Sequence, residues 1–325
     1  MLQRSVAQVP PGVVDYYFNR AAKRRNLEQS LREQFRSQGF EEIITPTFEY
    51  FDVFQRGMRE ELLSQSYRFF NRDGDLLALR ADSTCAVARL AATKLATSPL
   101  PLRLFYINPV FRKEAPHAGK FSEFVQAGIE LIGTNSTATD FEILKTAITT
   151  LQAIGLSRFQ INIGHVGVVN AVLSKANFSP EEEKFIRYFL AEKRLPELEN
   201  FLNTRNVAPE IRAVLNRIPL WVGKKETFGK IESLAENFQI EPILNHLQSL
   251  YRKLAEENLV QFVTFDLGNL KGMSYYTGIL FEIFAEHLGF PIGGGGRYDQ
   301  LLKKFGTDLP AVGFSFTLER LEAVL

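Results

Sequence analysis

The apolar and polar positions of the first half of the chain predict alternating helices and strands. Apolar residues recur at helical spacing from about Val14 to Ser37, and Gly39 provides a helix stop. Residues 67–79 have the pattern of a hairpin with its turn at 71–74. The same criteria predict further helices at about 83–97 and 138–154, and strands at 41–50 (broken by Pro46), 102–114, 122–133 and 158–163.

The second half begins with helical periodicity alone. From Gly164 to about Glu257 no strand is indicated, and Pro180 and Pro209 stand near expected helix starts. Strand patterns return with LVQFVTFDL, MSYYTGILFEIFA and PAVGFSFTL. We therefore expect an α+β fold with a mostly antiparallel sheet flanked by helices. Its core would be discontinuous, formed by residues 1–163 and 260–325, and residues 164–259 would be an all-helical insertion domain.

Composition excludes several classes of protein. Apolar residues make up 45% and charged residues 23%, the balance of a globular protein. A net charge of +1 gives no global attraction to nucleic acid or anionic membrane. The one cysteine, Cys85, excludes a disulfide framework, and the 4 histidines show no helical zinc spacing, so no metal is expected. With no long apolar run and no secretory signal pattern, we expect a cytoplasmic protein that does not contact a membrane.

Two expected strands carry an unusual polar pattern. Gln126, Gly128 and Glu130 share one face because side chains alternate along a strand, and Arg112 and Glu114 share a face of the partner strand. Such a face can simply be solvated. The glycine favours the alternative, a ligand lying close to the sheet.

Other candidates also have purely structural interpretations. Asp82 and Thr84 precede a helix and can cap it, or can receive a ligand's ammonium group. The run of glycines at 293–296, taken as a loop, is not a phosphate-binding Walker loop, since Arg-Tyr-Asp follows it. Arg320 is either a surface residue or a phosphate or adenine clamp. The basic cluster at 20–25 is expected to be the solvated face of the first helix, and Cys85 a small core residue.

The order of the motifs is more specific than any one of them. EEIITPTFE, YRFFNRDGDLLALRADST, FRKEAP, GKFSEFVQAGIELIG, KGMSYYTGILFE, GGGGRYDQL and AVGFSFTLERL follow one another along the chain. This series resembles the class II catalytic core of histidyl-tRNA synthetase over essentially the whole chain. The resemblance implies a class II synthetase-like fold, with the helical insertion where that family has one.

The sequence departs from the synthetase pattern at positions of catalytic importance. Lys271 stands where the family has an arginine that assists adenylation, and an ammonium does not replace a planar guanidinium. Ser122 stands where the family has an arginine that contacts ATP. Thr317 stands where the family has a glycine that lies under the adenine ring. The chain ends after the third motif, so no anticodon-binding domain, and hence no tRNA, is expected.

Positions that would recognise histidine are largely kept. By resemblance, Asp82 and Thr84 would receive the α-amino group, and Arg112 and Gln126 would lie near the carboxylate. A carboxylate and a phenol can each bond one imidazole nitrogen. The residues expected around the imidazole are Glu130, Tyr275 and Tyr276, and those expected to retain nucleotide contacts are Glu114 and Arg320.

Amino-acid recognition without the adenylation residues is typical of a sensor. With the RADST sequence and the DLGNLKGMSYYTG run, the chain resembles the regulatory subunits of ATP phosphoribosyltransferase, which are synthetase paralogues. That resemblance implies no catalysis and no cofactor, a short-form catalytic subunit as partner, L-histidine as effector and a homodimer within a hetero-oligomer. Two alternatives stay open: a histidine-adenylating enzyme without the anticodon domain, and a synthetase-like module that transfers an amino acid to a protein or modulates a kinase.

Overall fold

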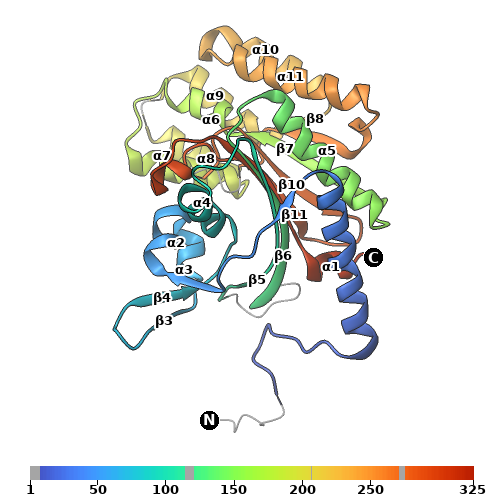
Figure 1. Ribbon diagram of the computed structural model, residues 1–325. Coiled ribbons are helices and arrows are strands. Elements are labelled where there is room, and N and C mark those ends of the chain that lie inside the picture. The colour runs from blue at the N-terminus through green and yellow to red at the C-terminus, as the bar shows by residue number, and fades with distance from the viewer. Residues whose placement is uncertain (1–7, 114–120, 206, 271–274) are drawn as a thin grey trace. The chain divides into compact units, whose positions relative to one another are not determined.

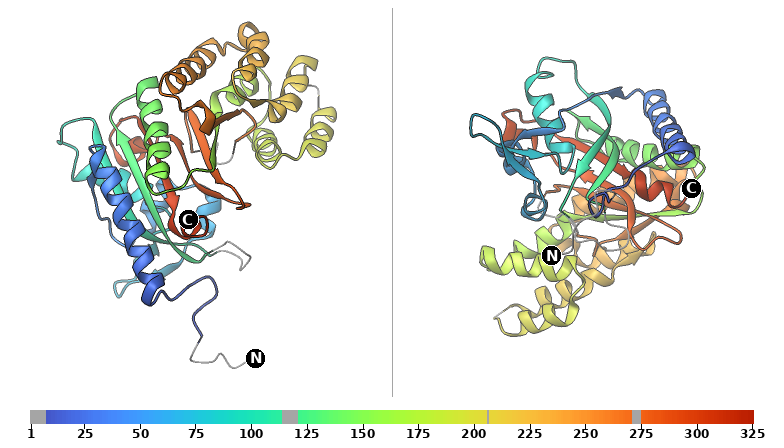
Figure 2. Two further views of the ribbon diagram at one scale, coloured as in Figure 1. Left: turned by 90° about the vertical axis from the view of Figure 1, so that its right-hand side faces the viewer. Right: turned by 90° about the horizontal axis from the view of Figure 1, so that it is seen from below.

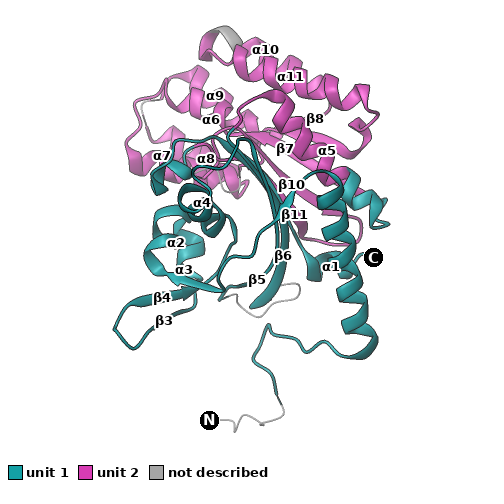
Figure 3. Ribbon diagram, in the orientation of Figure 1, with its two compact units in different colours: residues 1–133, 149–157, 300–325 teal, residues 134–148, 158–299 magenta. Residues whose placement is uncertain are grey.

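The chain folds into two compact units. The computed structural model describes residues 8–113, 121–205, 207–270 and 275–325, with the backbone alone at 235–236. Unit 1 comprises residues 1–133, 149–157 and 300–325, and unit 2 comprises 134–148 and 158–299 (Figure 3). These units do not follow the boundaries expected from the sequence, because the helical segment 164–259 shares unit 2 with strands on both sides of it.

Unit 1 contains four strands of the main sheet, in the order β1-β5-β6-β12. The long hairpin of β5 and β6 is antiparallel, and so is the pair of β6 with β12. β1 pairs parallel with β5. The hairpin confirms the two long strands expected from the sequence. The bounds are β1 Glu41–Glu42, β5 Leu102–Phe111, β6 Glu123–Ile132 and β12 Ala311–Thr317.

The helices of unit 1 pack on this sheet and on a smaller one. α1 (Phe18–Ser37) buries Leu27, Leu31 and Phe35 along the β5–β6 hairpin (Figures 1 and 2). A second sheet has the order β2-β4-β3 and contains the predicted hairpin. The remaining elements are β2 Phe48–Tyr50, α2 Phe51–Gly57, α3 Glu60–Ser64, β3 Arg68–Phe70, β4 Leu76–Leu79, α4 Thr84–Thr93, η3 Leu302–Phe305 and α12 Leu318–Glu322.

Unit 2 has five strands in the order β11-β10-β7-β9-β8 and a series of helices. As expected, Pro180 and Pro209 begin helices, and Ser179 completes a capping box. The elements are α5 Thr137–Ala153 (residues 149–153 belong to unit 1), β7 Phe159–His165, α6 Val166–Leu173, α7 Pro180–Ala191, α8 Leu195–Asn203, α9 Pro209–Arg217, η1 Ile218–Leu220, β8 Val222–Gly223, α10 Glu226–Phe238, α11 Glu241–Glu256, η2 Val260–Phe262, β9 Val263–Asp266, β10 Ile279–Ala285 and β11 Pro291–Arg297.

Three expectations from the sequence are wrong. The segment 164–259 is not all-helical, because the short strand β8 lies within it and pairs with β9. The glycine run at 293–296 is not a loop but most of strand β11, antiparallel to β10. At Gly294 the neighbouring backbone comes so close that an added Cβ would lie 2.8 Å from the carbonyl oxygen of Phe281. Arg24, assigned to a solvated helix face, is buried, and its guanidinium donates to Glu319 of α12 at 2.5 Å. No helix in the described part of the chain is long and apolar enough to cross a bilayer.

Candidate functional site

The polar face of the β5–β6 hairpin is buried. In the antiparallel register, Tyr106 lies opposite Gly128 and Asn108 lies opposite Gln126, so these side chains share the face that also carries Glu130. Gln126 and Glu130 are only 5% and 2% exposed. A solvated face, the simpler interpretation of the sequence pattern, is therefore wrong.

Asp82 connects the start of α4 to this face. One carboxylate oxygen, Oδ1, accepts from the backbone N–H of Thr84 at 2.9 Å. The other, Oδ2, accepts from the side-chain amide of Gln126 at 3.1 Å, and the Gln126 carbonyl accepts from the N–H of Ser83 at 3.2 Å. The N-cap of α4 is Ser83, whose side chain makes no capping bond, so neither Asp82 nor Thr84 is the cap that the sequence suggested. Asp82, one residue earlier, contacts both the first residue of α4 and the sheet.

Arg80 holds the segment that carries Asp82. Its buried guanidinium donates to the carbonyl oxygens of Thr45, Pro46 and Pro109 at 2.8–3.0 Å. Burial is the main cause that lowers the Arg80 pKa. These bonds tie the segment before α4 to β5, so the position of Asp82 is set by the backbone of neighbouring elements.

Arg112, just beyond the end of β5, also points to this segment. Its Nε donates to the carbonyl oxygen of Ala81 at 2.8 Å, and its Nη2 lies 3.6 Å from Asp82 Oδ2. The guanidinium lies over the ring of Phe124 at 5.0 Å from the centroid. Arg112 therefore places a positive charge beside the Asp82 carboxylate.

Tyr106, which sequence reasoning missed, joins the face to Glu130. Its hydroxyl lies 3.4 Å from Glu130 Oε1. Burial, followed by the charges of Glu130 and Asp82, holds the Tyr106 pKa well above its usual value, so the phenol stays protonated. The ring fills the space over Gly128 that the sequence suggested was open for a ligand, since a Cβ there would lie 2.6 Å from the Tyr106 hydroxyl.

This arrangement concentrates hydrogen-bond acceptors. The Asp82 and Glu130 carboxylates and a neutral phenol lie together, with the Arg112 guanidinium next to Asp82. A carboxylate accepts hydrogen bonds and stabilises a cation nearby. The face therefore suits a cationic group or an N–H donor. In the described part of the chain, no group of three or more His, Cys, Asp or Glu side chains is arranged to hold a metal.

Tyr275 and Tyr276 belong to unit 2. The Tyr275 ring lies 5.4 Å from that of Tyr298 and 5.3 Å from that of Tyr276, centroid to centroid. Directly after them, the N–H of Thr277 donates to the carbonyl of Arg297 at 2.7 Å. The residues around these two tyrosines are therefore fixed by contacts within unit 2.

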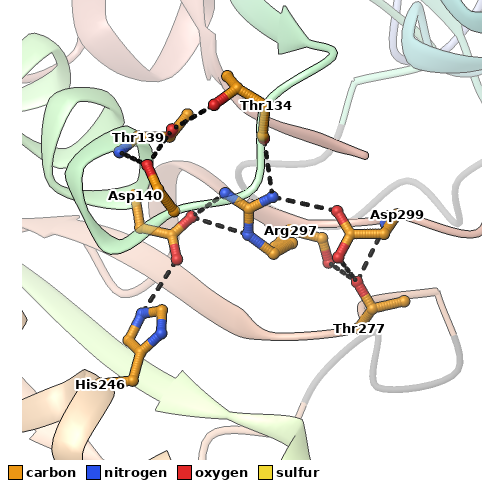
Figure 4. A network of polar contacts seen from close by, with 8 residues as sticks. Thr134, Thr139, Asp140, His246, Thr277, Arg297 and Asp299 are labelled. Carbon is orange, nitrogen blue, oxygen red and sulfur yellow. Dashed lines mark hydrogen bonds and ion pairs between the residues drawn. The ribbon is translucent and has the colours of Figure 1, made fainter. Parts of the chain in front are cut away.

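A buried charge network fixes Arg297 itself (Figure 4). Its Nε and Nη2 donate to Asp140 Oδ1 at 2.9 and 2.6 Å, and its Nη1 reaches Asp299 at 3.1 Å. Asp140 Oδ2 lies 3.0 Å from Nε2 of His246 on α11. The Thr277 hydroxyl completes the network with Asp299 at 3.1 Å. This network links α5, α11 and the end of β11 to the segment after the tyrosines.

The nucleotide-contact positions are only partly described. Arg320 is half-buried on α12, next to the Glu319 that pairs with Arg24. Glu114 and Lys271 lie outside the described residues. Thr317 ends β12 directly opposite Gln126, so the hydroxyl-bearing side chain shares the polar face of the hairpin.

Comparison with known proteins shows what the chain resembles. The sequence profile of the family "Histidyl-tRNA synthetase" matches residues 12–321. The ATP phosphoribosyltransferase regulatory subunit of Caldanaerobacter subterraneus subsp. tengcongensis is 39% identical over 98% of this chain and 82% of its own. That of Moorella thermoacetica is 40% identical over 97% of this chain and 81% of its own. A crystal structure of an ATP phosphoribosyltransferase regulatory subunit/histidyl-tRNA synthetase from Bacillus halodurans superposes with a TM-score of 0.89, at 32% identity, over 99% of this chain and 84% of that one.

Proposed function

This chain belongs to the ATP phosphoribosyltransferase regulatory subunit family, and from that premise we propose that it binds L-histidine and regulates a short-form catalytic subunit. The catalytic subunit would carry out phosphoribosyl transfer in the first step of histidine biosynthesis. The chain itself would have no catalytic activity. The catalytic subunit would require this chain for activity. Binding of histidine to this chain would inhibit the catalytic subunit, which is feedback inhibition.

The observation that carries this proposal is the buried polar face of unit 1. Asp82 and Glu130 offer two carboxylates, and Arg112 and Gln126 hold Asp82 in place. We assign the α-amino group of histidine to Asp82 and Thr84, its carboxylate end to Arg112 and Gln126, and its imidazole to Glu130. A site built from buried polar groups rejects ligands that leave those groups unpaired.

Feedback requires that histidine bind two states of the complex with different affinity. A coupling free energy of about 1–3 kcal/mol is typical of such regulation. The family resemblance favours a homodimer within a larger hetero-oligomer. We propose no tRNA, cofactor or metal as a ligand.

The proposal is tested by measuring phosphoribosyl transfer by the cognate short-form subunit, with and without this chain, across a histidine titration. We expect activity that depends on the chain and that falls as histidine rises. If the chain changes neither rate nor inhibition, the proposed partnership is wrong.

Histidine adenylation is the second candidate function. Arg112 and Arg320 stand at motif positions that hold ATP in the synthetases, and they favour it. Lys271, Ser122 and Thr317 oppose it because they replace residues of the adenylation machinery. Histidine-dependent exchange of pyrophosphate into ATP would support adenylation, and its absence alongside histidine binding would support the regulatory proposal.

A further inference from the structure

Two hydrogen-bonding groups on the polar face have no partner among the residues that the structure describes. They are the side-chain amide nitrogen of Asn108, on β5, and the hydroxyl of Ser83, just before α4. Asn108 is 3% exposed and Ser83 is 0% exposed. Buried polar groups in native proteins nearly always have a partner, so each such exception requires an explanation.

Both residues lie beside Gln126. Asn108 faces Gln126 across the antiparallel pair, so their side chains share the face that carries Glu130. The backbone N–H of Ser83 donates to the Gln126 carbonyl at 3.2 Å. One of the two N–H groups of the Gln126 amide donates to Asp82. Gln126 therefore positions Asp82 and the backbone of Ser83, and these contacts use neither the Ser83 hydroxyl nor the Asn108 amide nitrogen.

The chemistry of these groups is opposite to that of the carboxylates. An amide N–H and a hydroxyl both donate, and the Arg112 guanidinium, 3.6 Å from Asp82, adds positive charge at this end of the face. Asp82 and Glu130 would repel an anion. An amino acid's carboxylate can therefore be accepted only where donors offset that repulsion.

We propose that Asn108 and Ser83 bind the carboxylate of the effector and make the site selective for histidine over imidazole compounds that lack a carboxylate. This inference rests on the proposed function and adds to it two residues that determine specificity. The carboxylate accepts from the Ser83 hydroxyl and the Asn108 amide, in addition to Arg112 and Gln126. L-Histidinol, which keeps the amine and the imidazole but has an alcohol in place of the carboxylate, loses that interaction.

The test is calorimetric titration of this chain with L-histidine and with L-histidinol. The variants are Ser83→Ala, which removes a single oxygen, and Asn108→Asp, which replaces the donor by a negative charge at nearly constant volume. We expect each variant to weaken histidine binding about tenfold to a hundredfold, the range for hydrogen bonds to a charged group. Ser83→Ala should leave histidinol binding within about twofold, and Asn108→Asp should not weaken it, because the added negative charge attracts the histidinol ammonium group. Tyr106→Phe is the matched control: it removes a hydroxyl at the Glu130 end and should weaken both ligands alike.

Two results would overturn the inference. Equal weakening of both ligands in Ser83→Ala and Asn108→Asp would make these residues structural, and unchanged affinities would mean that they bind only water. If Asn108→Asp does not fold, Ser83→Ala decides alone, since it removes no packed carbon. A wild-type chain that binds neither ligand would instead contradict the proposed histidine site, a result distinct from a loss of selectivity.

Discussion

The ring of Tyr106 occupies the space that Gly128 leaves open on the neighbouring strand. A Cβ at Gly128 would lie 2.6 Å from both the Tyr106 hydroxyl and the carbonyl oxygen of Phe314. The glycine is therefore required by packing between strands, and it allows the phenol to reach Glu130. One missing side chain thus positions a hydrogen-bonding group of the candidate site.

Gly128→Ala should disturb both stability and ligand binding. The added methyl group would clash with the Tyr106 ring and also with the Phe314 carbonyl of the paired strand β12, so a side chain and a strand backbone must both shift. We expect the free energy of unfolding to fall by about 1–3 kcal/mol, the usual effect of overpacking, with weaker histidine binding. Denaturant unfolding and calorimetry measure the two effects. Gly229→Ala is the control: it lies on α10 with nothing within 4 Å of the added Cβ and should be neutral or stabilising by up to about 1 kcal/mol.

Glu130→Gln should weaken histidine binding without unfolding the chain. The amide keeps the size of the side chain and an acceptor for the Tyr106 hydroxyl, but it removes the charge. A loss of about 1.5–3 kcal/mol in binding free energy is expected for a charge-assisted hydrogen bond, and feedback inhibition of the complex should be lost in parallel.

The matched control for this variant is Glu123→Gln. Glu123 lies on the same strand, is exposed, and points to the opposite face. It should change neither affinity nor feedback. Both variants should still assemble with the catalytic subunit, and size-exclusion chromatography measures this assembly. Unchanged feedback in Glu130→Gln would contradict the assignment of Glu130.

The local pattern of apolar and polar residues predicted most of the helices and strands. The predictions failed where a residue's environment depends on a contact with a residue distant in sequence. The hairpin of β5 and β6 was predictable because two long segments of strand-forming residues follow one another along the chain. Arg24 was misassigned because helical periodicity cannot reveal Glu319, which pairs with it from the other end of the chain. The strand at 293–296 was missed because glycine disfavours strands, and its pairing with β10 does not follow from the local pattern.

The candidate site was predictable in part for a similar reason. Asp82, Arg112 and Gln126 were identified by type and spacing, and the structure brings them together, although their ligand remains a prediction. Tyr106 and Asn108 were missed because their facing partners follow only from the strand register. The short helices α2 and α3 were not predicted, because seven and five residues are too few to show a periodicity.

Breaking the Asp140–Arg297 pair should be strongly destabilising. Asp140 has no exposed surface and Arg297 is only 4% exposed. Asp140→Asn would therefore leave the buried guanidinium of Arg297 with less negative charge beside it. We expect the free energy of unfolding to fall by about 3–5 kcal/mol. The control is Lys145→Ala, on the same helix, which removes an exposed ion pair with Glu257 and should cost less than about 1 kcal/mol. Denaturant unfolding measures both variants. If the free energy of unfolding fell by a similar amount in each, burial would not explain the contribution of the Asp140–Arg297 pair.

His165 should make the chain less stable as the pH falls. Burial, with the neighbouring His246, lowers the His165 pKa to about 4, although Asp140 opposes this shift. Its Nδ1 accepts from the N–H of Gly167 and caps α6, which requires the neutral ring. The unfolded chain binds a proton near pH 6.5 and the folded chain only near 4, so stability is complete above about pH 6.5 and falls by about 3 kcal/mol toward pH 4. Urea unfolding from pH 7 to 4 measures this slope. His165→Asn keeps a capping acceptor but does not titrate in this range, so its free energy of unfolding should change less between pH 7 and 4. An unchanged pH dependence in that variant would mean that other groups cause it.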